Sequence, residues 1–325
     1  MDRKNKPYFF TEGLKEVSRF LGGDENIYLG IRPYGFHAGN QIVFNVYPDL
    51  LCEFLRKRGI EPKFNFFIFI NDWEQVKFAQ SDNSIKNYPF NVSPQDTIFQ
   101  FAIHDKTIAT LVDHWESVIL ENFYENVKNK YPQVSIFPVR NSSMRSSKWM
   151  KKVVLKTIEE PGLVADVLRR YSGKNVEEGA EYCRAVCPMC RTALVKNSLM
   201  GTDDVAIQCQ NCGFNGIRNY STLYFWLYHK PLAIPRIKEY RIDLCITGAD
   251  HHNEGDFLVR KNLFRAYNIS VKMPKTLYTP VLYGKNELPM GKSKNNTVNV
   301  EYNLLRKMVS ETNSKIVRIG NLYGG

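Results

Sequence analysis

Apolar residues follow two kinds of spacing in the first part of this chain. Residues 27–31 and 63–70 are apolar runs, and the second is dense in Phe and Ile, which is typical of a fully buried strand. Between them, residues 41–58 carry apolar side chains three or four positions apart, which predicts an amphipathic helix. Strand, helix and strand in this order form a βαβ unit, which implies a parallel sheet with a right-handed crossover.

The later part of the chain repeats both patterns. The predicted strands are residues 134–139, 242–246 and 277–283, and the predicted helices are the segment up to Gly22 and residues 107–130, 159–171 and 257–267. Residues 81–100 are polar and rich in turn-forming residues, so we expect irregular structure there. The fold class is therefore α/β, and ligands of such sheets lie beyond the carboxyl ends of the strands.

A glycine-rich turn, residues 30–40, joins the first predicted strand to the first amphipathic helix. The free N–H groups of a helix that starts at a strand end form an anion site, and phosphate is a common occupant. His37 adds a hydrogen-bond donor, and Gly39 has no side chain to keep a phosphate or a base away from the backbone. The alternative is a plain Gly-Pro connection with a hydrogen-bonded histidine.

Asp72 follows the dense apolar run almost directly, so it is placed at the carboxyl end of a predicted strand. This position makes it a candidate site residue. A helix N-cap is an equally good interpretation of an aspartate there.

Two Cys-x-x-Cys pairs form the most specific local pattern of the sequence, with eighteen residues between them. The four residues are Cys187, Cys190, Cys209 and Cys212. This spacing matches a tetrahedral four-thiolate Zn²⁺ site, which is structural because no position stays open. Buried or redox cysteines are the alternative; Cys183 is an alternative ligand, and we interpret Cys52 and Cys245 as buried core thiols.

Two further stretches carry candidate chemistry. Residues 248–251 (Gly-Ala-Asp-His) follow the end of a predicted strand. Residues 288–296 form a turn-prone loop that contains Lys292, Ser293 and Lys294, although a solvated lysine-rich loop would look the same.

Composition indicates a folded protein with a polyanionic ligand. Hydrophobic residues make up 43% and aromatic residues 13% of the 325 residues, enough for a substantial core. The net charge is +11, and from residue 257 onward twelve Lys/Arg against three Asp/Glu contribute +9 of it. Such asymmetry suits nucleotide phosphates or a nucleic-acid backbone, although a basic soluble surface is also common.

Two features of the sequence, its first residues and its cysteine pairs, predict the cellular location. No apolar segment follows residues 1–4, so we expect no signal peptide, and the longest strand-like apolar run is too short to span a bilayer. Four of the seven cysteines lie in metal-type pairs, which favours a reducing compartment. We therefore expect a cytoplasmic protein without a membrane partner.

Residues 37–40, 248–251 and 290–294, in this order, resemble the nucleotide-binding signatures of class I aminoacyl-tRNA synthetases. The first is similar to the HIGH motif in its HxGN form, and the last is similar to the KMSKS loop. Within that class, the chain is most similar to class I lysyl-tRNA synthetase, which also has a Gly-Ile-Thr-Pro-Ser-Gly lead-in, a Gly-Lys-Asp-His stretch and inserted cysteine pairs. The resemblance covers roughly residues 25–300.

The resemblance implies a Rossmann-like catalytic domain interrupted by a zinc-binding insertion. Residues 1–140 would be the first half of the nucleotide-binding domain, residues 141–225 the insertion with the four-cysteine zinc knuckles, and residues 226–325 the second half with the KMSKS-like loop. Only about thirty residues follow that loop, so we expect no anticodon-binding domain of the family's helical type.

The resemblance also implies the roles of individual residues. The ATP contacts would be Gly35, His37, Gly39, Asn40, Gly248, Asp250, His251, Lys292, Ser293 and Lys294. Among these, His37 and Lys292 would be catalytic, because they would stabilise the charge that develops on the phosphates. Arg32 and Asp72 would lie at the amino-acid pocket, and Mg²⁺ would bridge the phosphates of ATP.

Four residues depart from the family's pattern. Pro289 and Gly291 replace the first lysine and the first serine of the loop, and Arg32 and Tyr34 stand where the lysyl family has threonine and serine. An arginine in the pocket penalises a lysine ammonium and favours a neutral or acidic side chain. If Arg32 turns outward to ATP or to an RNA phosphate, lysine remains the substrate.

These observations lead to a preferred function and two alternatives. The preferred function is ATP-dependent activation of an amino acid as its adenylate, with transfer to the acceptor end of tRNA or to another acceptor. The first alternative is a catalytically silent synthetase paralogue that acts as a nucleotide- or RNA-binding regulatory module. A stand-alone zinc-ribbon nucleic-acid binder would explain the cysteines but not the two nucleotide motifs.

Overall fold

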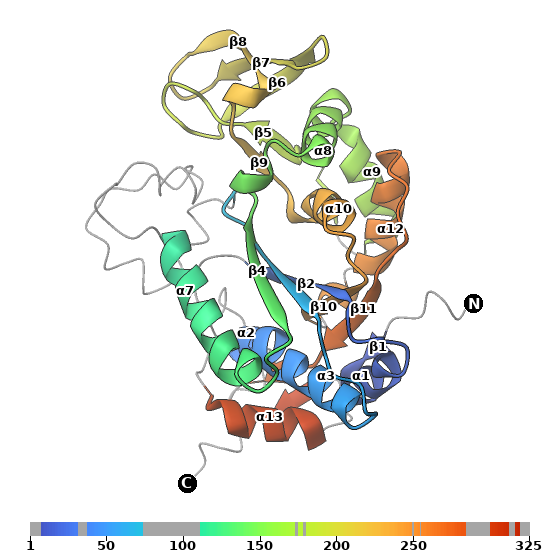
Figure 1. The fold of residues 1–325 in the computed structure, drawn as a ribbon. Helices are drawn as coiled ribbons and strands as arrows, with labels where there is room; N and C mark the ends of the chain where they lie inside the picture. Colours follow the sequence, from blue (N-terminus) through green and yellow to red (C-terminus); the bar gives the residue numbers. More distant parts are fainter. Residues whose placement is uncertain are drawn as a thin grey trace.

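The computed structural model describes residues 8–31, 38–73, 111–172, 175–177, 180–248, 250–253, 255–283, 300–311 and 316–318. At its centre lies a six-stranded parallel sheet in the order β1-β11-β10-β2-β3-β4 (Figure 1). Its strands are β1 (Tyr8–Phe9), β2 (Asn26–Ile31), β3 (Asn65–Ile70), β4 (Ser135–Arg140), β10 (Leu244–Gly248) and β11 (Lys275–Thr279). The predicted α/β class and parallel sheet are confirmed.

The direction in which the chain crosses the sheet reverses between β2 and β10. From β2 the chain proceeds outward through β3 to β4, and from β10 it proceeds outward on the other side to β11. The two central strands therefore come from opposite ends of the sequence. Such a reversal opens a crevice at the carboxyl edge of a doubly wound sheet.

Helices cover both faces of the sheet, so the molecule has three layers (Figure 1). One face carries α1 (Phe10–Ser18), α3 (Tyr47–Arg56), α7 (Leu111–Phe123) and α13 (Tyr302–Glu311), and the other carries α8 (Lys148–Glu159), α9 (Gly162–Tyr171), α10 (His229–Glu239) and α12 (Asp256–Ala266). Successive side chains of β2 point alternately to the two faces of the sheet, so they pack in two different cores. Ile27 and Leu29 pack in the first core, and Tyr28 packs against the second.

The predicted amphipathic helix at residues 41–58 is confirmed and begins slightly earlier. It consists of α2 (Ala38–Gln41), a π-helical turn η2 (Ile42–Val46) and α3. Pro48 has no amide hydrogen for the carbonyl of Phe44, and its ring would collide with that carbonyl in a regular α-helix. The wider turn before it, in which the Tyr47 N–H donates to the Ile42 carbonyl, accommodates the proline.

The predicted helix at residues 159–171 is confirmed as α9, and a further helix that was not predicted precedes it. Residues 148–159 already form α8, and α9 follows after Pro161. The Ser147 hydroxyl caps α8 by accepting hydrogen bonds from the Trp149 and Met150 N–H groups. The apolar face of α8 carries Met150, Val153, Val154 and Ile158, which join the core on the second face of the sheet.

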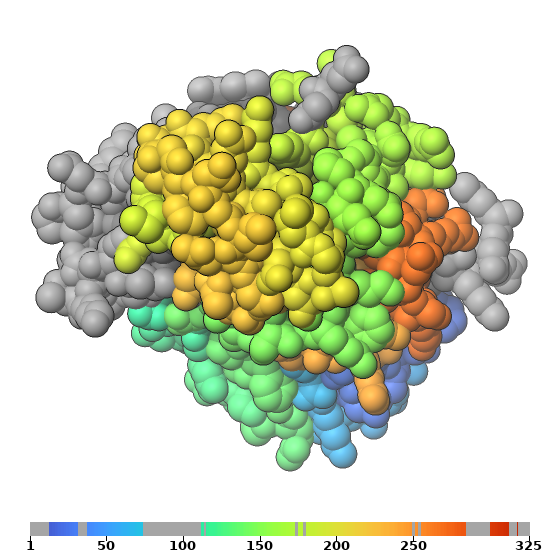
Figure 2. Space-filling model, turned by 90° about the horizontal axis from the view of Figure 1, so that it is seen from above, coloured from blue at the N-terminus to red at the C-terminus, as the bar shows by residue number. Residues whose placement is uncertain are grey.

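The cysteine pairs lie in a β-rich module at the top of Figure 1, and its apolar side chains join the core on the second face of the sheet. Its elements are β5 (Cys183–Ala185) paired with β9 (Phe225–Leu227), and the antiparallel sheet β6 (Val195–Met200), β7 (Asp204–Cys209) and β8 (Asn215–Asn219). Figure 2 shows this module, in yellow, from above. In the part of the chain that the structure describes, no helix combines the length and hydropathy needed to cross a membrane.

Short elements follow the two strands β10 and β11. The predicted strand at residues 277–283 is divided between β11 and β12 (Val281–Tyr283), and β12 pairs in parallel with β13 (Ile316–Arg318). The short helix α11 (Asp250–Asn253) follows β10 directly.

Candidate functional site

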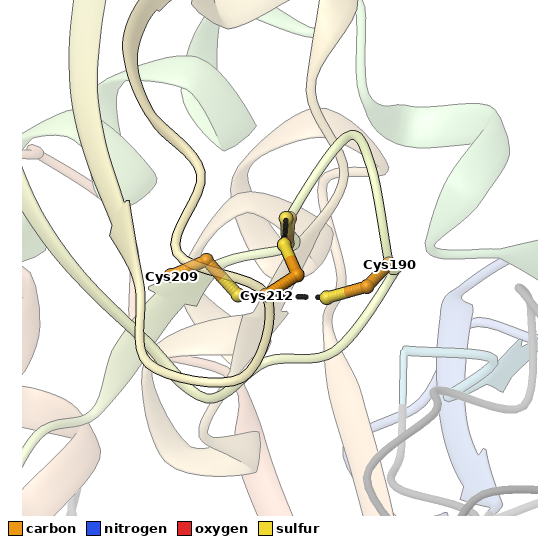
Figure 3. A group of neighbouring side chains, drawn as sticks. Cys190, Cys209 and Cys212 are labelled. Carbon is orange, nitrogen blue, oxygen red and sulfur yellow. Dashed lines mark hydrogen bonds between the residues drawn. The ribbon is translucent and has the colours of Figure 1, made fainter.

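Four thiols converge where the loop between β5 and β6 meets the loop between β7 and β8 (Figure 3). They belong to Cys187, Cys190, Cys209 and Cys212, and all four sulfur atoms lie within 4.8 Å of one another. The Sγ atoms of Cys187 and Cys212 are 3.6 Å apart, and those of Cys190 and Cys209 are 3.5 Å apart. A tetrahedral site with Zn–S bonds of about 2.3 Å places its sulfurs about 3.8 Å apart, so these residues fit Zn²⁺.

The two cysteine turns share one backbone design. The N–H of Arg191 donates to the Cys187 carbonyl at 2.9 Å, and the N–H of Gly213 donates to the Cys209 carbonyl at 3.2 Å. Both Arg191 (φ 63°) and Gly213 (φ 74°) adopt the left-handed backbone conformation. Each turn therefore closes on its first cysteine and points both of its sulfurs toward the other turn, as a metal knuckle requires.

The pKa values of two of these thiols are shifted in opposite directions. Burial acts to raise the pKa of Cys190, but hydrogen bonds from the Asn211 side chain, the Thr192 backbone and the neighbouring thiols lower it to about 6. Burial raises the pKa of Cys209 to about 12. A bound dication favours ionisation of the thiols, so metal binding and deprotonation are linked.

The other three cysteines lie outside this group. Cys183 is buried in β5, and burial raises its pKa. Cys52 and Cys245 are fully buried, so their interpretation as core thiols is confirmed. Among the described residues, the metal-type group contains only the four cysteines of the two pairs.

A second candidate site lies at the carboxyl edge of β2 and β10. Leu244 pairs with Ile27 and Ile246 with Leu29, so the continued register places Gly248 level with the last residue of β2. Gly39 and Asn40 lie in α2, the helix that follows β2, and α2 packs against β12. His251 lies in α11, which follows Gly248 closely. Segments far apart in the sequence thus leave the sheet side by side.

Several predicted site residues lie outside the residues that the structure describes. They are Arg32, Gly35, His37, Lys292, Ser293 and Lys294. The structure describes only the backbone of Asp250, which is the first residue of α11. In α2, the Oδ1 atom of Asn40 is buried without a hydrogen-bond partner, a situation that a ligand can relieve.

Asp72 lies just beyond the carboxyl end of β3, as predicted, and is fully buried. Its carboxylate accepts hydrogen bonds from the Ser142 N–H, at 3.1 Å, and from the Ser142 hydroxyl. Burial raises the pKa of Asp72 to about 6, although Ser142 and Arg140 act to lower it. The carboxylate thus holds the start of the short helix η4 (Ser142–Met144), and a contact with an amino acid remains a prediction.

Sequence reasoning did not identify the polar network beside Asp72. The Asn141 amide donates to the Asn71 Oδ1 atom at 2.6 Å, and the buried Arg236 Nε donates to the Asn141 Oδ1 atom at 3.1 Å. The Nη1 group of Arg236 also donates a hydrogen bond to the Tyr28 hydroxyl at 2.8 Å. Asn71 and Asn141 each directly follow a strand, which was a usable signal, whereas Arg236 lies in α10, a helix that the apolar spacing did not predict.

Taken together, the described residues form a Rossmann-like parallel α/β sheet with an inserted four-cysteine module that is consistent with zinc binding. No protein-family model matches the sequence, and no curated protein matches it significantly. The arrangement is similar to solved synthetase structures at low identity. Tyrosyl-tRNA synthetase from Archaeoglobus fulgidus matches with a TM-score of 0.44 and 15% identity over 89% of this chain and 65% of that chain.

Two other solved structures give similar values. A putative arginyl-tRNA synthetase from Campylobacter jejuni has a TM-score of 0.41 and 14% identity over 95% of this chain and 70% of that chain. A glutamate–tRNA ligase from Elizabethkingia meningosepticum has a TM-score of 0.37 and 14% identity over 84% of this chain and 52% of that chain. Similarities of this size carry no inference about activity or substrate.

Proposed function

We propose that this protein activates an amino acid with ATP as its adenylate and transfers it to tRNA or another acceptor, in the manner of a class I, lysyl-like synthetase. The observation that supports the proposal is the reversal of chain direction between β2 and β10. Two of the three stretches that resemble synthetase signatures, residues 37–40 and 248–251, follow these two adjacent parallel strands. Ligands of open α/β sheets bind at that position.

The proposed chemistry needs positioned donors rather than a covalent intermediate. The amino-acid carboxylate attacks the α-phosphate of ATP, the bond to pyrophosphate breaks, and negative charge grows on the phosphate oxygens. His37, the N–H groups at the start of α2 and Lys292 would stabilise that charge. Mg²⁺, bound mainly through the nucleotide's own phosphates, would neutralise part of it.

The test is ATP–pyrophosphate exchange, screened over a panel of the twenty amino acids. The proposal expects exchange that depends on one amino acid or on a small group of chemically related ones. Transfer to bulk tRNA, measured with the amino acid so identified, then separates a tRNA acceptor from another acceptor. Absence of exchange with every amino acid would contradict activation.

The catalytically silent paralogue remains the second candidate because of Pro289 and Gly291. These residues replace a lysine and a serine in the loop that would act on the phosphates. This candidate predicts that ATP or RNA binds while no amino acid supports exchange. Equilibrium binding of ATP, measured beside the exchange assay, distinguishes the two.

The cysteine module has a structural role in either case. Four thiolates leave no open position on zinc for a substrate. The domain limits 1–140, 141–225 and 226–325 and the cytoplasmic location remain predictions. Within the predicted insertion, α8 and α9 contribute to the core on the second face of the sheet.

A further inference from the structure

The surface of the central strand β2 is open at Gly30. β2 is hydrogen-bonded to β10 on one side and to β3 on the other, and Leu29 and Ile31 are buried on the first face. Gly30 points to the second face and is exposed. Strands of a parallel sheet are normally covered on both faces, so this opening next to the carboxyl edge is unusual.

The ring of Tyr28 lies beside Gly30 on this face. A Cβ atom at Gly30 would be 2.9 Å from the Tyr28 hydroxyl oxygen, closer than real Cβ contacts, and 3.0 Å from its Cε1 atom. Because Gly30 has no Cβ atom, the phenol ring of Tyr28 fits beside it without a collision. Gly30 is the residue before the last of β2, so the Tyr28 hydroxyl lies close to the carboxyl end of this strand.

Arg236 donates a hydrogen bond to the Tyr28 hydroxyl. Arg236 is 3% exposed, and its remaining described hydrogen bonds go to the Asn141 Oδ1 atom. Within the described residues, no carboxylate lies within ion-pair distance of this guanidinium. The nearby buried cations differ, since Lys230 and Arg260 share the carboxylate of Asp256.

A buried guanidinium without a matching anion is costly. Because the Tyr28 oxygen accepts a hydrogen bond from Arg236, its own proton is directed elsewhere, and among the described residues it has no acceptor. A donor polarised by an arginine forms a strong hydrogen bond with an anionic oxygen. Such an anion would satisfy both the hydroxyl proton and the unmatched charge.

We propose that Tyr28 and Arg236 bind the side-chain carboxylate of an acidic amino acid, aspartate or glutamate, as the substrate of this protein. The inference rests on the proposed function. That function places the α-carboxylate of the amino acid, which reacts with ATP, at the carboxyl edge of β2, and the amino-acid side chain then lies over Gly30. A side-chain amide can accept the hydrogen bond but leaves the charge of Arg236 unmatched. A lysine ammonium would add a like charge beside Arg236.

The experiment measures binding without ATP, by calorimetry, with L-glutamate, L-aspartate, L-glutamine and L-lysine as probes. The native protein should prefer an acidic amino acid. Tyr28→Phe removes only the hydroxyl and should weaken that binding by about 10- to 100-fold, the range for a hydrogen bond to a charged group. Tyr240→Phe is the matched control, because Tyr240 packs on the same sheet face against Phe67 and Phe69, and binding should be unchanged.

Arg236→Lys provides a second variant that keeps a positive charge but loses the fork of donors, and it should also weaken binding of the acidic amino acid. Circular dichroism confirms that each variant is folded. Equal binding of lysine or glutamine by the native protein, or unchanged binding by Tyr28→Phe, overturns the inference, and so does binding of none of the four probes.

The exchange assay separates this inference from the proposed function. Binding of an acidic amino acid that Tyr28→Phe weakens, without any exchange, supports the subsite and contradicts activation. Lysine-dependent exchange that Tyr28→Phe leaves unchanged supports activation and overturns the subsite.

Discussion

Single residues at the carboxyl edge combine burial with polar chemistry, and Asp72 is the clearest example. Its pKa is about 6 in the folded protein because burial disfavours the charged form, against 3.8 for the ordinary group. Between these pH values the folded state holds the proton that the unfolded state releases, so stability falls as pH rises through this window. At neutral pH, Asp72 therefore costs stability.

Asp72→Asn should remove this cost. An amide oxygen can still accept from the Ser142 N–H, while the charge that burial penalises is gone. At pH 4 the variant should match the native protein, and at pH 7.5 it should be more stable by up to roughly 3 kcal/mol, because a tenfold change in proton affinity corresponds to about 1.4 kcal/mol. Urea unfolding at the two pH values measures the difference. A variant that is less stable by the same amount at both pH values would contradict this account.

At the residue scale, the sequence predicted the features that depend on neighbours in the chain. The four cysteines were identified because a Cys-x-x-Cys turn is local. Asp72 was placed correctly at a strand end, but its partner Ser142 lies seventy positions away and no local pattern indicates it. The burial of Arg236 depends on which helix covers the sheet, so it was not predictable from helical spacing.

Among the elements, the two cysteine turns allow a test of backbone strain. Arg191 and Gly213 occupy equivalent left-handed positions, which cost an ordinary residue about 1 kcal/mol more than glycine. Arg191→Gly should therefore stabilise the module by about 1 kcal/mol, and Gly213→Ala should destabilise it by a similar amount. Thermal unfolding of the zinc-loaded protein measures both, and shifts of the same sign in the two variants would contradict the equivalence.

The metal content of the module is a separate prediction. Protein purified without added metal should contain about one zinc per chain, the stoichiometry of a four-thiolate site. Cys190→Ser should lower zinc affinity and destabilise β6–β8 more than the central sheet, because the metal contributes folding energy locally. Elemental analysis and hydrogen exchange measure these effects. Four freely titratable thiols in zinc-free protein would rule the site out.

The buried carboxylate of Asp49 holds helix α13 against helix α3. Asp49, in α3, accepts hydrogen bonds from the Tyr302 hydroxyl at 2.5 Å, from the Tyr131 hydroxyl at 3.0 Å and from Arg306. Burial acts to raise the pKa of Asp49, yet Tyr302 and Arg306 lower it overall. The charged form of Asp49 thus anchors α13 to α3.

Asp49→Asn should lower the free energy of unfolding by about 2 kcal/mol, because it leaves buried donors with a weaker partner. Glu53→Gln is the control. Glu53 also pairs with Arg306 but is more exposed, so its effect should stay below about 1 kcal/mol. Chemical denaturation at pH 7 compares the two variants, and equal losses would mean that burial of Asp49 is not the cause.

For the whole molecule, patterns along the chain predicted the class of fold but not the order of its strands. The βαβ unit of residues 27–70 required a parallel sheet, and this requirement is met. Nothing in the apolar runs indicated that β10 would lie beside β2, because strand order depends on contacts across more than two hundred residues. That neighbour relation supports the proposed site more than any single motif does.

The formation of an aminoacyl-adenylate tests the central claim most directly. The protein is incubated with ATP, Mg²⁺ and the amino acid that supports exchange, without any acceptor, and the bound nucleotide is identified by mass spectrometry. We predict the adenylate of that amino acid, formed at least ~10²-fold more slowly by Lys292→Ala while ATP still binds, the pattern of a lost transition-state contact. ATP bound intact in the presence of every amino acid, or adenylate formed at the same rate by Lys292→Ala, would contradict the account.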